Sequence, residues 1–149
     1  MSGLTTFVGF AHPWMCDAMG HVNARHYMAM FDDASLLLLD QVAAGPISNE
    51  AGWADVRCEI DYVTEIRAGT ALQITSLVER VGTSSLTMRH LLAGSSDGVA
   101  HARAKVVSVR FDLAARRAMP LLPDERRRAE ELLGGKAGTS PTGTSQGGE

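Results

Sequence analysis

One long apolar helix is predicted over the segment that begins at Ala24, and the rest of the chain must be arranged to bury it. Apolar residues recur there at three- and four-residue spacing, which is the pattern of one helix face. They are Tyr27, Met30, Phe31, Ala34, Leu37, Leu38 and Val42, and the face is widened by Met28, Leu36 and Leu39. This width predicts a largely buried helix. Asn23 is the expected N-cap, and Gly45-Pro46 the expected stop.

The remaining pattern is that of strands joined by short turns. Residues 4–12 form a first strand that ends at Pro13. After the helix, alternating apolar residues predict a half-buried strand around 56–62 and further strands over 71–81, 84–93 and 99–113. Turns are expected at 67–70, 82–85 and 94–98, and a short charged helix at 124–133. Short connections imply an antiparallel sheet, so the fold class is α+β, with one sheet wrapped around one buried helix.

Length and composition indicate a single domain. The 149 residues suit one folded unit, predicted over residues 1–133, followed by a disordered Gly/Ser/Thr-rich tail over 134–149. A net charge of −3 gives no electrostatic case for binding nucleic acid or a membrane. We find no secretion signal, and the longest apolar run, Leu36–Leu39, is far too short to span a bilayer. Cys16 and Cys58 are therefore interpreted as reduced thiols of a cytoplasmic protein.

A polar motif lies directly before the apolar helix. It reads Asp17-Ala18-Met19-Gly20-His21-Val22-Asn23, and Tyr27 and Phe31 follow it in the helix. This motif and the order of elements resemble the hot-dog fold acyl-CoA thioesterases of the 4-hydroxybenzoyl-CoA thioesterase type. The strand–turn–strand segment 60–74, the final strand and the PLLP segment at 120–123 fit the same family. The resemblance covers roughly residues 5–125.

The resemblance implies how this site would work. Asp17 would either attack the thioester directly or activate water, and both routes remain open. The backbone N–H of Ala24, with Asn23 beside it, is the expected oxyanion hole, because a helix N-terminus presents unpaired donors and a positive dipole end. Gly20 would allow the tight turn between them. His21 is either a base or, as we favour, an organiser of the loop.

The substrate implied by the resemblance is an acyl-CoA, so coenzyme A enters as part of the substrate and no other cofactor is expected. No metal site is predicted, since His21 and His26 are five residues apart. The basic residues Arg89, His90, Arg103 and Lys105 are candidates for binding the CoA phosphates. The family also implies a homodimer, often doubled to a homotetramer. The acyl pocket would then lie between the subunits, with Tyr27 as part of its wall. Facing strands of the partner subunit would supply another part of it, around Tyr62 and around Thr83, Ser84 and Ser85.

Two other functions stay open at this point. A hot-dog hydratase or dehydratase would need a His with an acid placed differently from any pair evident in this sequence. A non-catalytic acyl-CoA sensor would bind thioesters without hydrolysing them. Hydrolysis of an acyl-CoA panel separates both alternatives from a thioesterase.

Overall fold

The computed structural model describes residues 2–43 and 50–134, and its elements follow the predicted order. The chain runs through β1 (Leu4–Phe10), a 3-10 turn (Pro13–Met15) and α1 (Ala24–Val42). It then runs through β2 (Ala51–Tyr62), β3 (Ala71–Val81), β4 (Ser85–Gly94), β5 (Ala100–Asp112), β6 (Arg117–Ala118) and α2 (Pro123–Glu131). The two-residue strand β6 is too short to be recognised from its sequence. Gly45-Pro46 and most of the predicted tail lie outside the described residues.

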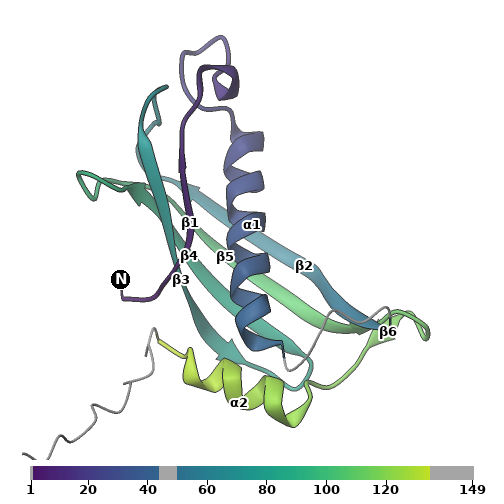
Figure 1. The fold of residues 1–149 in the computed structure, drawn as a ribbon. Helices are drawn as coiled ribbons and strands as arrows, with labels where there is room; N and C mark the ends of the chain where they lie inside the picture. Colours follow the sequence, from purple (N-terminus) through teal and green to yellow (C-terminus); the bar gives the residue numbers. More distant parts are fainter. Residues whose placement is uncertain (1, 44–49, 135–149) are drawn as a thin grey trace, which may run out of the picture.

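The strands form a single sheet in the order β1-β3-β4-β5-β2, with β6 paired to β5, and every pair is antiparallel. Figure 1 shows the sheet curving around α1, with α2 below the C-terminal end of that helix. The predicted α+β class, one antiparallel sheet around one long helix, is therefore confirmed. Asn23 caps α1 as predicted, because its Oδ1 accepts from Arg25 N at 3.1 Å.

The core forms where α1 meets the concave face of the sheet. The buried helix residues include Tyr27, Phe31, Ala34 and Leu38. They pack with alternate residues of β3, β4 and β5, namely Leu72, Ile74, Leu86, Met88, Leu92, Ala102, Ala104 and Val106. Ala102 and Ala104 are small, so the helix can lie close to β5 at this point.

One expectation about burial was wrong. Leu37 was predicted to lie in the buried face, and Met28 and Leu36 to widen it together with Leu39. Leu39 is buried, but Met28, Leu36 and Leu37 are 37%, 59% and 42% exposed. Strand β2, predicted to be half-buried, is exposed on both faces from Asp55 to Glu59. Both differences have one cause. The sheet covers only one side of α1, and β2 lies at its edge, beyond β5.

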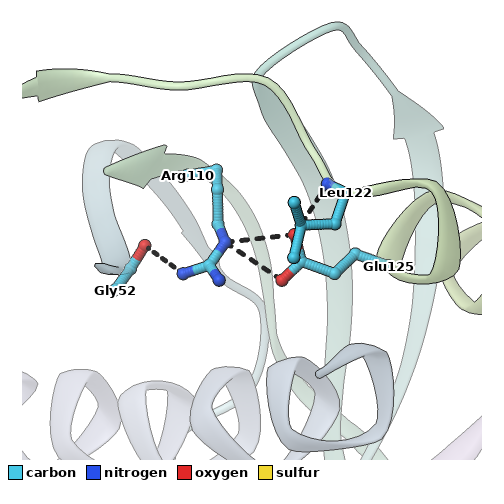
Figure 2. A network of polar contacts seen from close by, with 4 residues as sticks. All are labelled: Gly52, Arg110, Leu122 and Glu125. Carbon is cyan, nitrogen blue, oxygen red and sulfur yellow. Dashed lines mark hydrogen bonds and ion pairs between the residues drawn. The ribbon is translucent and has the colours of Figure 1, made fainter. Parts of the chain in front are cut away.

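A buried ion pair attaches α2 to the end of the sheet that lies near the C-terminus of α1 (Figure 1). Arg110 Nε on β5 donates to Glu125 Oε1 at 3.1 Å and lies 3.0 Å from Oε2 of the same carboxylate. The guanidinium also donates to Gly52 O at 3.2 Å, and Glu125 Oε1 accepts from Leu122 N at 2.9 Å (Figure 2). Because Glu125 is only 2% exposed, this network joins β5, the start of β2 and the start of α2 in the interior.

A second network of hydrogen bonds crosses the core next to the middle of α1. Thr6 donates to Ile74 O at 3.4 Å, Ser76 Oγ lies 2.6 Å from Thr6 Oγ1, and His90 Nδ1 lies 2.5 Å from Ser76 Oγ. The other ring nitrogen of His90 lies 3.0 Å from Ser35 Oγ on α1. A neutral imidazole satisfies this network, since Nδ1 can donate to Ser76 while Nε2 accepts from Ser35. His90 therefore does not reach the surface as a CoA-binding residue.

Stability is expected to fall as the pH drops from about 6.5 to about 4. Burial lowers the pKa of His90 from 6.5 to about 4, so the unfolded chain binds this proton first as the pH falls. Complete protonation should cost about 3 kcal/mol of unfolding free energy, at about 1.4 kcal/mol per pKa unit. Urea titrations across this pH range measure the effect, and His90→Gln should remove most of the slope. An unchanged slope in that variant would show that other groups cause it.

Candidate active site

Asp17 lies in a tight turn directly before α1. Its backbone N–H donates to His21 O at 3.1 Å, and Gly20 N donates to Asp17 O at 3.0 Å. Gly20 has φ +82°, a conformation that favours glycine, so the turn depends on this residue as predicted. Met19 N donates to Asp17 Oδ1 at 2.9 Å. The loop thus fixes the carboxylate from within its own backbone.

Asn23 joins this carboxylate to the helix. Its Nδ2 donates to Asp17 Oδ2 at 2.9 Å, while its Oδ1 accepts from Arg25 N at 3.1 Å. One amide group therefore caps α1 and positions Asp17 against the N-terminus of the same helix. The sequence predicted Asn23 as the N-cap of α1. It did not predict the hydrogen bond from Asn23 to Asp17, because that bond depends on the shape of the turn.

The first N–H of α1 is available to a ligand. Arg25 N is bonded to the Asn23 side chain, and His26 N donates to Asn23 O at 3.0 Å. Within residues 2–43 and 50–134, no acceptor is found for Ala24 N, and Ala24 is exposed. An unpaired donor at the positive end of a 19-residue helix is suited to stabilising a developing oxyanion.

Asp17 is ionised at neutral pH. The hydrogen bond from Asn23, followed by the bond from Met19, lowers the pKa of Asp17 below its ordinary value of 3.8. The carboxylate is exposed, so a substrate or water can approach it. An ionised, accessible carboxylate beside a free helix N–H has the components that acyl transfer needs, a nucleophile or base and an oxyanion donor.

The His21 side chain contacts another loop. Its Nε2 forms an ion pair with Glu65, which lies between β2 and β3. This contact agrees with our preference for His21 as an organiser of the loop. Glu65 was missed in the sequence, because it lies 44 residues beyond His21 and carries no motif of its own.

The predicted acyl-binding residues are only partly brought together. Tyr27 is buried, and its ring meets that of Tyr62 edge-on, with centroids 5.0 Å apart. Thr83, Ser84 and Ser85 lie at the other end of the sheet, where Leu121 N donates to Thr83 O at 3.0 Å just before α2. Figure 1 shows that this end is remote from the start of α1. The predicted role of these hydroxyls therefore requires a second subunit.

The predicted phosphate-binding residues lie on the outer face of the sheet. The side-chain nitrogens of Arg89 and Lys105 lie 2.8 and 3.6 Å from carboxylate oxygens of Glu79. Arg89, Arg103 and Lys105 together line a hollow of about 390 Å³. Their side chains alternate with the residues that face α1, such as His90 and Ala104, so they point away from the helix. Glu79 reduces the positive charge that two of them offer to a phosphate.

Neither metal binding nor membrane insertion is indicated by the described residues. Within residues 2–43 and 50–134, no three His, Cys, Asp or Glu side chains are grouped as a metal site would need. In the same part of the chain, neither helix combines the length and the apolar character needed to cross a bilayer.

Comparison with known proteins places this fold and motif among thioesterases. A family model described as the thioesterase-like superfamily matches residues 11–129. Similar solved structures include a predicted thioesterase from Bacillus stearothermophilus, with 23% identity, a TM-score of 0.76, and coverage of 85% of this chain and 94% of that one. No curated protein sequence matches the chain.

Two further structures support the fold. A thioesterase from Thermus thermophilus, complexed with coenzyme A and Zn, shares 23% identity with a TM-score of 0.75, covering 87% of this chain and 94% of that one. A 1,4-dihydroxy-2-naphthoyl-CoA thioesterase from Synechocystis shares 16% identity with a TM-score of 0.74, covering 86% and 96%. Together with the sheet order, these likenesses confirm the predicted hot-dog fold.

Proposed function

Because the chain belongs to the thioesterase-like superfamily, we propose that it hydrolyses acyl-CoA thioesters, with Asp17 as nucleophile or general base. Asn23 supplies the observation that supports this most directly. The same side chain caps α1 and donates to Asp17 Oδ2 at 2.9 Å, which holds an ionised carboxylate at the N-terminus of α1. In the described part of the chain, the N–H of Ala24 at this terminus has no acceptor. No cofactor is required by this chemistry.

The N–H of Ala24 and the carboxylate of Asp17 have separate roles in the proposed reaction. The thioester oxygen accepts a hydrogen bond from Ala24 N–H, which stabilises the negative charge that develops on it. Asp17 then attacks the carbonyl carbon or takes a proton from the attacking water. Because the pKa of Asp17 is lowered, both routes begin from the ionised carboxylate. In the nucleophilic route, attack by Asp17 forms a mixed anhydride and breaks the C–S bond, so that CoA leaves as the thiolate, and water then hydrolyses the anhydride to the free acid. In the general-base route, Asp17 takes a proton from water as the water attacks, and the CoA thiolate leaves and is protonated.

Hydrolysis of a panel of acyl-CoAs tests the activity. Aromatic, short-chain, long-chain and betainyl thioesters are incubated with the protein, and the released thiol is measured. We expect turnover of at least one class, with free acid and CoA formed in equal amounts. Measurable binding without turnover of any member would instead favour the sensor function.

The active assembly is proposed to be a homodimer formed through β2. Among the described residues, this strand pairs with β5 alone, so no strand of residues 2–43 and 50–134 covers its other edge. Val56 and Tyr62 on β2 are 63% and 56% exposed, and Leu36 on α1 is 59% exposed. A second copy would cover these apolar groups and continue the sheet. Sedimentation should give twice the 15.9 kDa chain mass, or four times if dimers associate, and a strictly monomeric protein would contradict the assembly.

A further inference from the structure

Trp14 is a large apolar residue in the 3-10 turn before the catalytic motif, and the reaction described above gives it no role. Its side chain is 71% exposed, so it contributes little to the core. Its ring nevertheless has two aromatic contacts. It stacks on His12, with centroids 5.8 Å apart and planes 9° apart, and it meets His26 edge-on, with centroids 5.3 Å apart. An exposed indole held by two rings indicates a role other than core packing.

The contact with His26 joins the 3-10 turn to the first turn of α1, above which Figure 1 shows this loop. The backbone N–H of His26 donates to Asn23 O at 3.0 Å, and Asn23 N donates to Met15 O at 2.8 Å. Met15 directly follows Trp14 in the chain. The four residues therefore form a closed circuit of contacts around the N-cap. Asn23 cannot shift relative to the 3-10 turn without breaking one of them.

The position of Asn23 decides the position of the candidate catalytic carboxylate. Its Nδ2 donates to Asp17 Oδ2 at 2.9 Å, while its Oδ1 accepts from Arg25 N. The Asp17 turn extends beyond the bridge between Cys16 and Val22, and Asp17 is exposed, so apolar packing does not hold its carboxylate. Small displacements of a reacting group lower reaction rates strongly. A rotation of the N-cap would therefore move the carboxylate and slow the reaction.

We propose that Trp14 is a positioning residue of the active site, which acts through His26 and Asn23 on the carboxylate of Asp17. His12 supports this role by fixing the orientation of the indole. The inference rests on the proposed function and deepens it, because it adds a residue outside the Asp17–Asn23 motif that sets the rate. Trp14 contacts no reacting atom in this arrangement, so its effect is on kcat and not on substrate binding.

Two substitutions of Trp14 test this role in the full chain. Trp14→Ala removes the contact with His26 and should lower kcat for acyl-CoA hydrolysis about 3- to 10-fold, the effect of one aromatic contact, with KM unchanged. Trp14→Phe keeps an aromatic ring at this position and should restore most of the rate. Phe10→Ala is the matched control, because it removes an exposed aromatic side chain from β1, outside the circuit.

A double-mutant cycle tests whether Trp14 acts through His26. His26→Ala removes the same ring contact from the other side and keeps the backbone N–H that donates to Asn23 O. It should lower kcat to a similar extent. The variant with both substitutions should lose no more activity than the more impaired single variant, because the two residues share one interaction. Losses that multiply would contradict a shared contact.

The pKa of Asp17 provides a readout that does not require turnover. The hydrogen bond from Asn23 is the main cause that lowers this pKa. Loosening of the N-cap in Trp14→Ala should therefore raise the pKa of Asp17 toward its ordinary value, whereas Phe10→Ala should leave it lowered. Titration of the carboxyl signal by NMR measures this change, and far-ultraviolet circular dichroism confirms that each variant is folded.

The proposal requires both changes in Trp14→Ala, the lower kcat and the raised pKa of Asp17. Either change without the other, or neither, would overturn it. Equal losses of activity in Trp14→Ala and Phe10→Ala would also overturn it, since the effect would then not depend on the circuit. A raised pKa in a protein whose wild type hydrolyses no acyl-CoA would support the positioning of the carboxylate and reject the thioesterase function, so the two failures are distinguishable.

Discussion

Asp17→Asn is expected to lower kcat for acyl-CoA hydrolysis by about 10²–10⁴-fold, the range contributed by a positioned acid–base group. The variant keeps the size of the side chain but loses the negative charge that either chemical route requires. It should also place a donor opposite Asn23 Nδ2, which removes one of the two bonds that hold the carboxylate. Thiol release under saturating substrate measures the loss.

The folded state should tolerate this substitution. Asp17 is exposed, and water can satisfy the groups that its amide leaves unpaired. Circular dichroism and the urea midpoint should therefore remain close to those of the wild type. Asp33→Asn is the matched control, because it makes the same chemical change on an exposed residue of α1. Wild-type turnover by Asp17→Asn would remove Asp17 from the mechanism, whatever the behaviour of the control.

Local patterns in the sequence predicted the features that depend on local physics. Helix α1 follows from apolar spacing, its start from the capping chemistry of Asn23, and the antiparallel strands from alternation between short turns. The turn around Gly20 was predictable for the same reason, since its positive φ is a property of one residue. Asp17 was singled out by the resemblance of its motif to a known family, since local chemistry alone describes it equally well as a turn acid.

Features that depend on tertiary placement could not be predicted in this way. Glu65 meets His21 only because the β2–β3 connection folds over the Asp17 turn, and no local pattern encodes that contact. Arg89 and Lys105 alternate correctly along their strands, but alternation does not reveal that Glu79 lies between them. The exposed residues of β2 and α1 have the apolar character of a core, and only the sheet order shows that they lie at its edge.

The largest loss of stability is expected from Glu125→Gln. The substitution preserves shape but leaves the Arg110 guanidinium, only 12% exposed, without its counter-charge. Breaking a buried ion pair from one side typically costs about 3–5 kcal/mol, and we expect a loss of about 3 kcal/mol here. Urea unfolding at fixed protein concentration measures it.

Glu131→Gln provides the matched control for this effect. Glu131 pairs with Arg127 at 2.8 Å on the exposed face of the same helix, so its loss should cost at most about 0.5 kcal/mol. Removing both charges of the buried pair, as in Arg110→Met with Glu125→Leu, should cost less than Glu125→Gln alone, because no uncompensated charge remains. Near-wild-type stability of Glu125→Gln would show that solvent reaches Arg110. Helix α2 would then be held mainly by apolar contacts with the core, through Leu121 just before it and Ala129 near its end.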